Sequence, residues 1–225
     1  SNNGWEFVLG YKNNFSNGIS LDILSNVSHF ERKITYLPTD VLTGYPGDPG
    51  NGKTILGRSD LSMFGYIADG LFQNQEEVDN SAIQNGKGIG RIRYRDIGGW
   101  YEDGNFVNIP DGVVNDLDRT WIGDSTPDLE FGFNTTISYK QFDVNAFFQG
   151  LIGRDVYNEF KHLTDFTSIW QGTNFGSRTL DAWSPNNTDS TIPMLTLTDK
   201  NNESRYSTYF IENGSYLKLR NIQIG

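Results

Sequence analysis

An acidic loop in the middle of the sequence carries residue types that bind divalent cations. Segment 111–118 opens on Asp-Gly, continues with an apolar anchor and ends on Asp118, which fits the second half of a calcium loop. Apolar residues stand where the first-half ligands are expected, so Asp96 or Asp103 would have to fold back to complete the site. We predict Asp96, Asp111 and Asp118 as candidate ligands of Ca²⁺ or Mg²⁺, with a solvated acidic turn as the alternative.

Aromatic side chains that we expect to be exposed in loops form a second group of candidate binding residues. Such rings stack on sugars or on peptide side chains, but they also anchor loops to one another or to a partner protein. The candidate substrate-binding residues are Trp100, Tyr101, Trp170 and Trp183.

Nothing in the sequence predicts a catalytic residue. The carboxylate pairs Glu76-Glu77 and Asp116-Asp118 lie close in the chain without any sign of the cleft that glycoside hydrolysis needs. The glycines of 86–90 are not followed by a Lys-Ser/Thr pair or a helical pattern, so they form a loop rather than a phosphate cradle. We therefore expect no enzyme.

Composition excludes several classes of protein. The 225 residues contain no cysteine and only two histidines, His29 and His162, which rules out disulfides and disfavours an imidazole-rich metal site. A net charge of -10 argues against nucleic-acid binding. Aromatic residues make up 14% of the chain although mean hydropathy is -0.51, a mixture typical of twisted strands with long polar connections and of barrels with aromatic girdles.

Strict alternation of apolar and polar residues predicts the strands that must position these groups. Residues 5–11 and 19–34 alternate on either side of an Asn- and Gly-rich turn, and so do 129–139 and 142–149 on either side of Lys140-Gln141. A last alternating run covers 215–224. Alternation alone fits a soluble β-sandwich as well as a membrane barrel, because either gives each strand one apolar face.

The long connections favour the barrel. Two stretches rich in Gly, Asn, Asp and Thr, 38–127 and 153–213, are predicted to be irregular and alternate with tight turns. Outer-membrane barrels have this arrangement, with long loops on the extracellular side only. No apolar run reaches the ~20 residues of a membrane helix. The first residue is not Met and no signal peptide precedes the first strand pattern, so we interpret the chain as a piece of a longer polypeptide.

Several motifs, in order, resemble the carboxy-terminal region of SusC/RagA-like TonB-linked outer-membrane proteins. They are 65–78 (GYIADGLFQNQEEV), 91–96 (RIRYRD), 111–119 (DGVVNDLDR), 122–128 (IGDSTPD), 147–150 (FFQG), 153–158 (GRDVYN), 183–187 (WSPNN) and 213–225 (NGSYLKLRNIQIG). This family commonly runs without a break where this chain has an insertion between Asp96 and Asp111.

The resemblance implies that residues 1–225 are the carboxy-terminal part of a TonB-dependent receptor. The plug, the TonB box, the earlier strands and the closing strand would lie outside this sequence. The implied partners are a SusD-like surface lipoprotein, TonB, outer-membrane lipid and a glycan or peptide substrate.

We therefore expect an all-β fold: part of an antiparallel transmembrane β-barrel with long extracellular loops, importing large nutrients across the outer membrane. The alternative is a soluble, secreted β-sandwich that binds carbohydrate. The two differ at Phe131, Phe133, Val144 and Phe148, which would face lipid in a barrel and a second protein layer in a sandwich.

Overall fold

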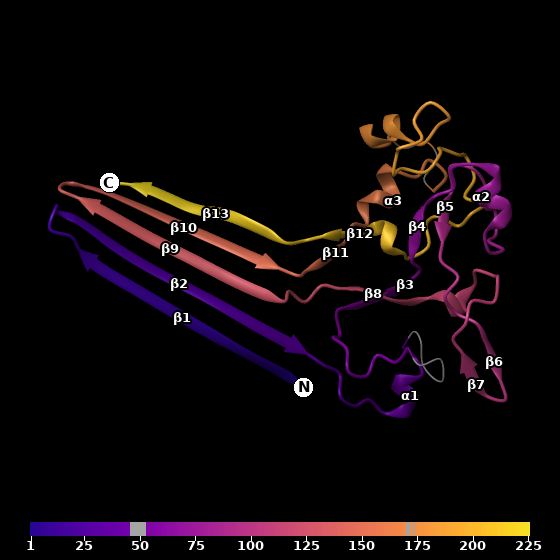
Figure 1. Cartoon of the computed structure of the whole chain (residues 1–225), viewed down its shortest axis with the longest axis horizontal. Helices are drawn as coiled ribbons and strands as arrows, with labels where there is room; N and C mark the ends of the chain where they lie inside the picture. Colours follow the sequence, from indigo (N-terminus) through magenta and orange to yellow (C-terminus); the bar gives the residue numbers. More distant parts are fainter. Residues whose placement is uncertain (46–52, 170–171, 173) are drawn as a thin grey trace.

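The computed structural model describes residues 1–45, 53–169, 172 and 174–225. A long antiparallel sheet projects from a body of loops, short strands and short helices (Figure 1). In the described part of the chain, no helix has the length and apolar character needed to cross a membrane.

The large sheet has five strands: β1 (Asn2–Asn14), β2 (Ile19–Arg32), β9 (Leu129–Tyr139), β10 (Phe142–Ile152) and β13 (Tyr216–Ile224). Their order is β1-β2-β9-β10-β13, and every pairing is antiparallel. The predicted hairpins are confirmed, although β2 ends at Arg32 rather than near Ile34. The strands β1 and β13 form the two edges, so the described sheet is not closed into a barrel.

All tight turns lie at one end of the sheet and all long connections at the other (Figure 1). The turn between β1 and β2 uses Gly18 at φ +85°, and the turn between β9 and β10 uses Lys140 at φ +57°. A positive φ is easily adopted by glycine and rarely by other residues, so Gly18 meets a conformational need. The sequence order of tight turn and long connection therefore corresponds to two ends of one sheet.

The register places most apolar residues of the five strands on one face, because directly opposed residues share a face. The apolar face carries Trp5, Phe7, Leu9 and Tyr11 from β1, Ile19, Leu21, Ile23 and Val27 from β2, Leu129, Phe131, Phe133 and Ile137 from β9, Phe142, Val144 and Phe148 from β10, and Leu217, Leu219, Ile222 and Ile224 from β13. The opposite face carries mainly Asn, Gln, Ser, Thr and charged residues, with Val8, Leu24, Phe30, Phe147, Leu151 and Tyr216 as apolar or aromatic exceptions.

A β-bulge keeps β13 in phase with this apolar face. Phe147 pairs with Asn221 but Phe148 pairs with Leu219, so Arg220 is an extra residue without a partner. Because a strand alternates with period two, Leu219 and Ile222 would otherwise lie on opposite faces. The bulge puts both on the apolar face.

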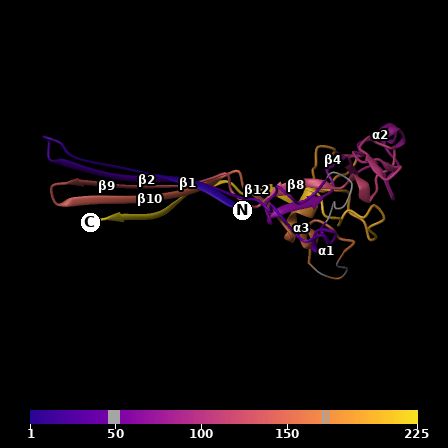
Figure 2. The same cartoon turned by 90° about the horizontal axis from the view of Figure 1, so that it is seen from below.

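The sheet is a single layer (Figure 2). Every residue of β13 and nearly every residue of β1 is exposed on both faces. Phe133 and Val144 keep 36% and 38% of their surface exposed. Phe131 and Phe148 are partly covered by neighbours in the same sheet, as in the Phe133–Phe148 ring contact at 6.4 Å. The architecture is therefore not a β-sandwich.

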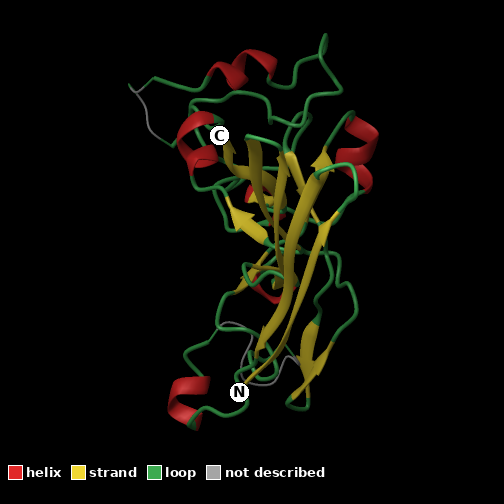
Figure 3. Ribbon diagram, turned by 90° about the vertical axis from the view of Figure 1, so that its left-hand side faces the viewer, coloured by secondary structure: helices red, strands yellow, loops and turns green. Residues whose placement is uncertain are grey.

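The two long connections fold together into what we call the loop body, so the prediction that they are irregular needs correction. The first contains α1 (Thr39–Leu42), β3 (Ser62–Gly65), β4 (Ala68–Leu71), α2 (Gln75–Asn80), β5 (Ile92–Tyr94), β6 (Trp100–Glu102), β7 (Asn105–Val107), η1 (Asp116–Asp118) and β8 (Thr120–Asp124). The second contains β11 (Asp155–Tyr157), α3 (Phe160–Thr164), η2 (Ser177–Asp181), η3 (Thr208–Phe210) and β12 (Ile211–Asn213). Seen along the large sheet, most of the helices lie around the outside of the molecule (Figure 3).

The main buried cluster of the described chain lies in the loop body rather than on the large sheet. It comprises Tyr66, Leu71, Ile92, Tyr94, Phe166, Trp183 and Phe210, contributed by both connections. A buried polar group adds to it: the Glu203 carboxylate accepts hydrogen bonds from Arg91 (2.7 Å) and from the Ile92 amide (3.0 Å). These contacts join segments more than a hundred residues apart.

Candidate functional site

The acidic loop closes on itself through backbone hydrogen bonds. The Asp96 carboxylate accepts from the amides of Asp111 at 3.2 Å and Gly112 at 2.7 Å. Asp96 therefore does fold back onto the segment that starts at Asp111, whereas Asp103 lies in an exposed turn. This contact ties together the two ends of the insertion.

Asp118 has a similar structural role. It is 1% exposed, and its Oδ1 accepts from the amides of Ile97 and Gly98 at 2.8 Å each. Its Oδ2 accepts from the Asn115 amide at 2.6 Å, which completes a capping box on η1. A buried carboxylate with three amide donors is satisfied without a cation.

The geometry does not gather the predicted metal ligands into a site. Among the described residues, no three His, Cys, Asp or Glu side chains are grouped closely enough to hold a metal ion. Partial burial raises the pKa of Asp96, and the negative charges of Asp118 and Asp111 add to this rise. Cation binding by Asp96, Asp111 and Asp118 stays a prediction.

Two of the predicted aromatic residues are exposed on the insertion between Asp96 and Asp111. The insertion forms the β6–β7 hairpin, closed by an Asp103-Gly104 turn in which both residues have positive φ. Trp100 and Tyr101 keep 42% and 48% of their surface exposed. Both are accessible to a ligand or a partner.

The other two predicted aromatic residues have different outcomes. Trp183 is buried in the core cluster, and its indole N–H donates to Oε1 of Gln73 at 2.9 Å. The expectation that Trp183 is an exposed loop residue is therefore corrected: it packs against Gly90 and holds the loop body together. Trp170 lies outside the described residues.

The glycine-rich segment 86–90 is a loop with a structural lysine. Lys87 Nζ donates to the carbonyl oxygens of Val78 (2.6 Å), in the last turn of α2, and of Ser81 (3.0 Å), which follows the helix. A cation at the carboxyl end of a helix satisfies carbonyls that lack intrahelical partners. At the start of the same helix, Glu77 accepts from the Gln73 amide at 2.9 Å, so this carboxylate is also structural.

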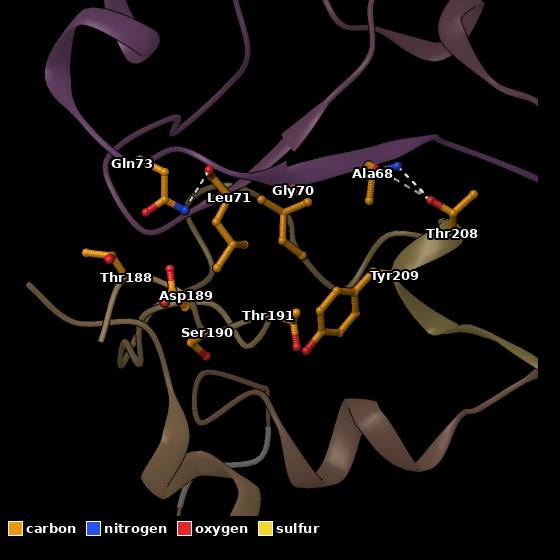
Figure 4. Close-up of a pocket in the computed structure, with 11 residues that line it drawn as sticks. Ala68, Gly70, Leu71, Gln73, Thr188, Asp189, Ser190, Thr191, Thr208 and Tyr209 are labelled. Atoms are coloured by element: carbon orange, nitrogen blue, oxygen red, sulfur yellow. Dashed lines mark hydrogen bonds between the residues drawn. The ribbon is translucent and has the colours of Figure 1, made fainter. Parts of the chain in front are cut away.

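A cavity of about 690 Å³ opens between β4 and the segment 188–191 (Figure 4). Its floor is apolar, with Ala68, Leu71 and Ile92, and the Tyr209 ring lines one side. Thr188, Asp189, Ser190 and Thr191 form the rim. The size and the apolar lining with a few polar groups are typical of small-molecule sites. Sequence reasoning missed this cavity because its walls come from four separated segments.

Known proteins with a similar sequence or fold are receptors and transporters by name. No family model matches the chain. It is 30% identical over its full length to TonB-dependent receptor P3 of Formosa agariphila, and 29% identical over 99% of its length to TonB-dependent receptor P26 of the same organism. A solved structure of the RagAB peptide transporter covers 99% of the chain with a TM-score of 0.69 and 20% identity. A closed-closed state of the RagAB peptide importer gives a TM-score of 0.67.

The chain is related over its full length to TonB-dependent receptors, and it shares the fold of the matching part of the RagAB transporter.

The chain corresponds to only part of the length of these relatives. It spans 21% and 22% of the lengths of the two receptors, and 22% of the RagAB chain. The segment between Asp96 and Asp111, which the sequence predicts to be an insertion, forms the β6–β7 hairpin, and the Asp96 and Asp118 carboxylates bind backbone amides at its base. The loop body thus carries an exposed aromatic hairpin.

Proposed function

We propose that this chain forms part of the wall and the extracellular mouth of a transmembrane β-barrel. The barrel would import a large nutrient, an oligosaccharide or an oligopeptide, across the outer membrane with energy transmitted by TonB. A SusD-like surface lipoprotein would cover the mouth. In this proposal the chain is the carboxy-terminal part of the receptor.

One observation carries the proposal: a single-layer sheet has a continuous apolar face over five strands and a mostly polar opposite face. Apolar burial is worth ~25 cal/mol per Å², so an uncovered face of this size would be costly in water. A barrel in a bilayer covers that face with lipid and leaves the polar face in a water-filled lumen.

The two ends of the sheet support an orientation. Long, folded connections at one end and tight turns at the other are typical of outer-membrane barrels, in which the long loops face outward. The loop body would then meet the lid and the nutrient, with Trp100 and Tyr101 on its exposed hairpin. The Asp96–Asp118 loop holds that hairpin, with or without a bound cation.

The proposed mechanism is transport without covalent chemistry. The lid would open, the loops would capture the nutrient, the lid would close, and TonB would rearrange the plug. The carboxylates considered for catalysis serve in part as backbone caps, and the curated relatives are named receptors rather than enzymes.

Site-directed spin labelling of the complete receptor tests the membrane orientation. Single cysteines would replace Phe133, Asn134, Thr136 and Ile137 on β9, and their nitroxides would be measured for collision with oxygen and with a water-soluble nickel chelate. We expect labels at 133 and 137 to favour oxygen, because they face lipid. Labels at 134 and 136 should favour the chelate.

Equal accessibility of neighbouring positions, or protection of 133 and 137 from both reagents, would contradict a lipid-facing sheet. Uptake of labelled oligosaccharides and oligopeptides by cells that express the receptor, with and without TonB, tests import separately. Uptake that persists undiminished without TonB would refute the energy coupling.

A further inference from the structure

The cavity beneath β4 has at its rim an exposed carboxyl group without a partner in the described chain. In the described chain, no hydrogen bond or ion pair involves the Asp189 side chain, which points from the rim toward β4 (Figure 4). The other functional groups of the lining are more constrained. The Tyr209 hydroxyl donates to Asp165 at 2.9 Å, and the Gln73 amide joins Trp183 to the Leu71 carbonyl.

Asp189 is also the only charged residue of the described lining. The arginines on either side of Ile92 in the sequence point away from the cavity, because neighbours in a strand face opposite sides. Arg91 pairs with Glu203 at 2.7 Å, and Arg93 pairs with Glu77 at 3.4 Å. The cavity therefore has one negative charge above an apolar floor, and no described cation neutralises it.

We propose that this cavity binds the free amino terminus of a peptide. An ammonium group donates three hydrogen bonds, and the Asp189 carboxylate with the hydroxyls of Thr188 and Thr191 offers acceptors at the rim. The first side chains of the peptide would lie on Ala68, Leu71 and Ile92. This proposal rests on the proposed function, since the loop body must face the medium from which nutrient arrives.

A sugar fits these walls less well. Sugar rings are commonly bound by stacking on an exposed aromatic face. Here Trp183 is buried beneath Gln73, and the Tyr209 ring packs against Phe166 and Phe210. The floor consists of aliphatic side chains, which suit aliphatic peptide side chains.

Binding to the purified complete receptor in detergent tests the proposal. The probes are the tripeptide Ala-Leu-Ala, its N-acetylated form and glucosamine, each titrated calorimetrically into wild type, Asp189→Asn and Asp103→Asn. Asp103→Asn is the matched control, since it removes another exposed loop carboxylate. We expect Asp189→Asn to weaken the binding of the free tripeptide about tenfold, the typical effect of losing a charge-assisted hydrogen bond. N-acetylation of the tripeptide should weaken its binding to the wild-type receptor by a similar factor.

Several results would overturn the proposal. These are no binding of the tripeptide to wild type, equal binding of its free and acetylated forms, or an Asp189→Asn variant that binds like wild type. Binding of glucosamine that depends on Asp189 in the same way would assign the cavity to amino sugars instead. Heat-modifiable migration on gels confirms that each variant is folded. Uptake by cells is scored separately, so a receptor that binds the peptide through Asp189 but imports nothing would refute only the proposed function.

Discussion

At the scale of single residues, the aromatic cluster of the loop body includes a half-buried histidine, His162. The His162 ring stacks on Phe210 with centroids 3.9 Å apart, and its Nε2 lies 2.9 Å from the Tyr157 hydroxyl. Burial lowers the pKa of His162, although the Glu159 carboxylate partly offsets this effect. The folded loop body therefore favours the uncharged imidazole.

This shift predicts that acid loosens the cluster. Because the pKa of His162 in the folded state is lower than the ordinary 6.5, its contribution to stability is complete above pH 6.5 and is lost as the pH falls. Hydrogen exchange at the amides of Asn158 and Asp165, corrected for intrinsic rates, should accelerate between pH 7.5 and 5.5. His162→Phe keeps a stacking ring but cannot titrate, so it should abolish this acceleration. An unchanged acceleration in His162→Phe would assign it to another group.

Residue roles were the least predictable part of the molecule. The residue types of Asp96 and Asp118 predicted cation binding, and that of Trp183 predicted ligand stacking. The role of each side chain depends, however, on the residues that surround it in the fold. Asp118 is buried against three amides from two separate segments, and Trp183 packs against Gly90 from the other long connection. A local pattern contains no information about such long-range neighbours. The Asp189 cavity was missed for the same reason.

At the scale of elements, the alternation of apolar residues was a sufficient guide to the hairpins. On the apolar face of β9 and β10 each apolar residue of one strand opposes an apolar or small residue of the other, so local pattern and register agree. The elements of the loop body are only three to six residues long. They are too short for a periodic signal and depend on packing.

The bulge in β13 gives a prediction at this scale. Deleting Arg220 leaves Leu217, Leu219, Ile222 and Ile224 in strict alternation, so a regular strand can pair with β10 and keep its apolar face. We expect the complete receptor with this deletion to insert and migrate as a folded barrel on unheated gels. Deletion of Asn145 is the matched control. It should prevent folding, because it would shift Phe142 and Val144 to the polar face in a strand that is paired on both sides.

A folded Asn145 deletion together with an unfolded Arg220 deletion would contradict this account of the bulge. It would mean that the identity of Arg220, rather than the phase of the strand, matters for assembly. Arg220→Ala distinguishes these cases, since it keeps the phase and removes only the side chain. We expect this variant to fold like wild type.

At the scale of the whole molecule, the two parts of the chain need different surroundings. The loop body has its own core, whereas the sheet has an uncovered apolar face and two edge strands, β1 and β13, each paired on one side only within the described chain. Leu9 and Phe142 keep 71% and 69% of their surface exposed, and Ile224 keeps 75%. Exposed apolar surfaces and open strand edges both promote association in water.

Residues 1–225 expressed alone should therefore form soluble aggregates or precipitate in buffer without detergent. In detergent micelles the apolar face is covered, so we expect smaller and more uniform particles. Light scattering after size exclusion measures the particle size, and circular dichroism should show a β-sheet spectrum.

Replacing Phe7, Leu9 and Tyr11 together by serine should reduce aggregation in buffer, because it removes apolar surface from an edge strand. The triple replacement of Glu6, Val8 and Lys12 by serine, on the opposite face of β1, controls for the number of changes and should have less effect. A stable monomer of the wild-type chain in detergent-free buffer, with cooperative unfolding, would show that the protein itself can cover this face, and the membrane assignment would then fail.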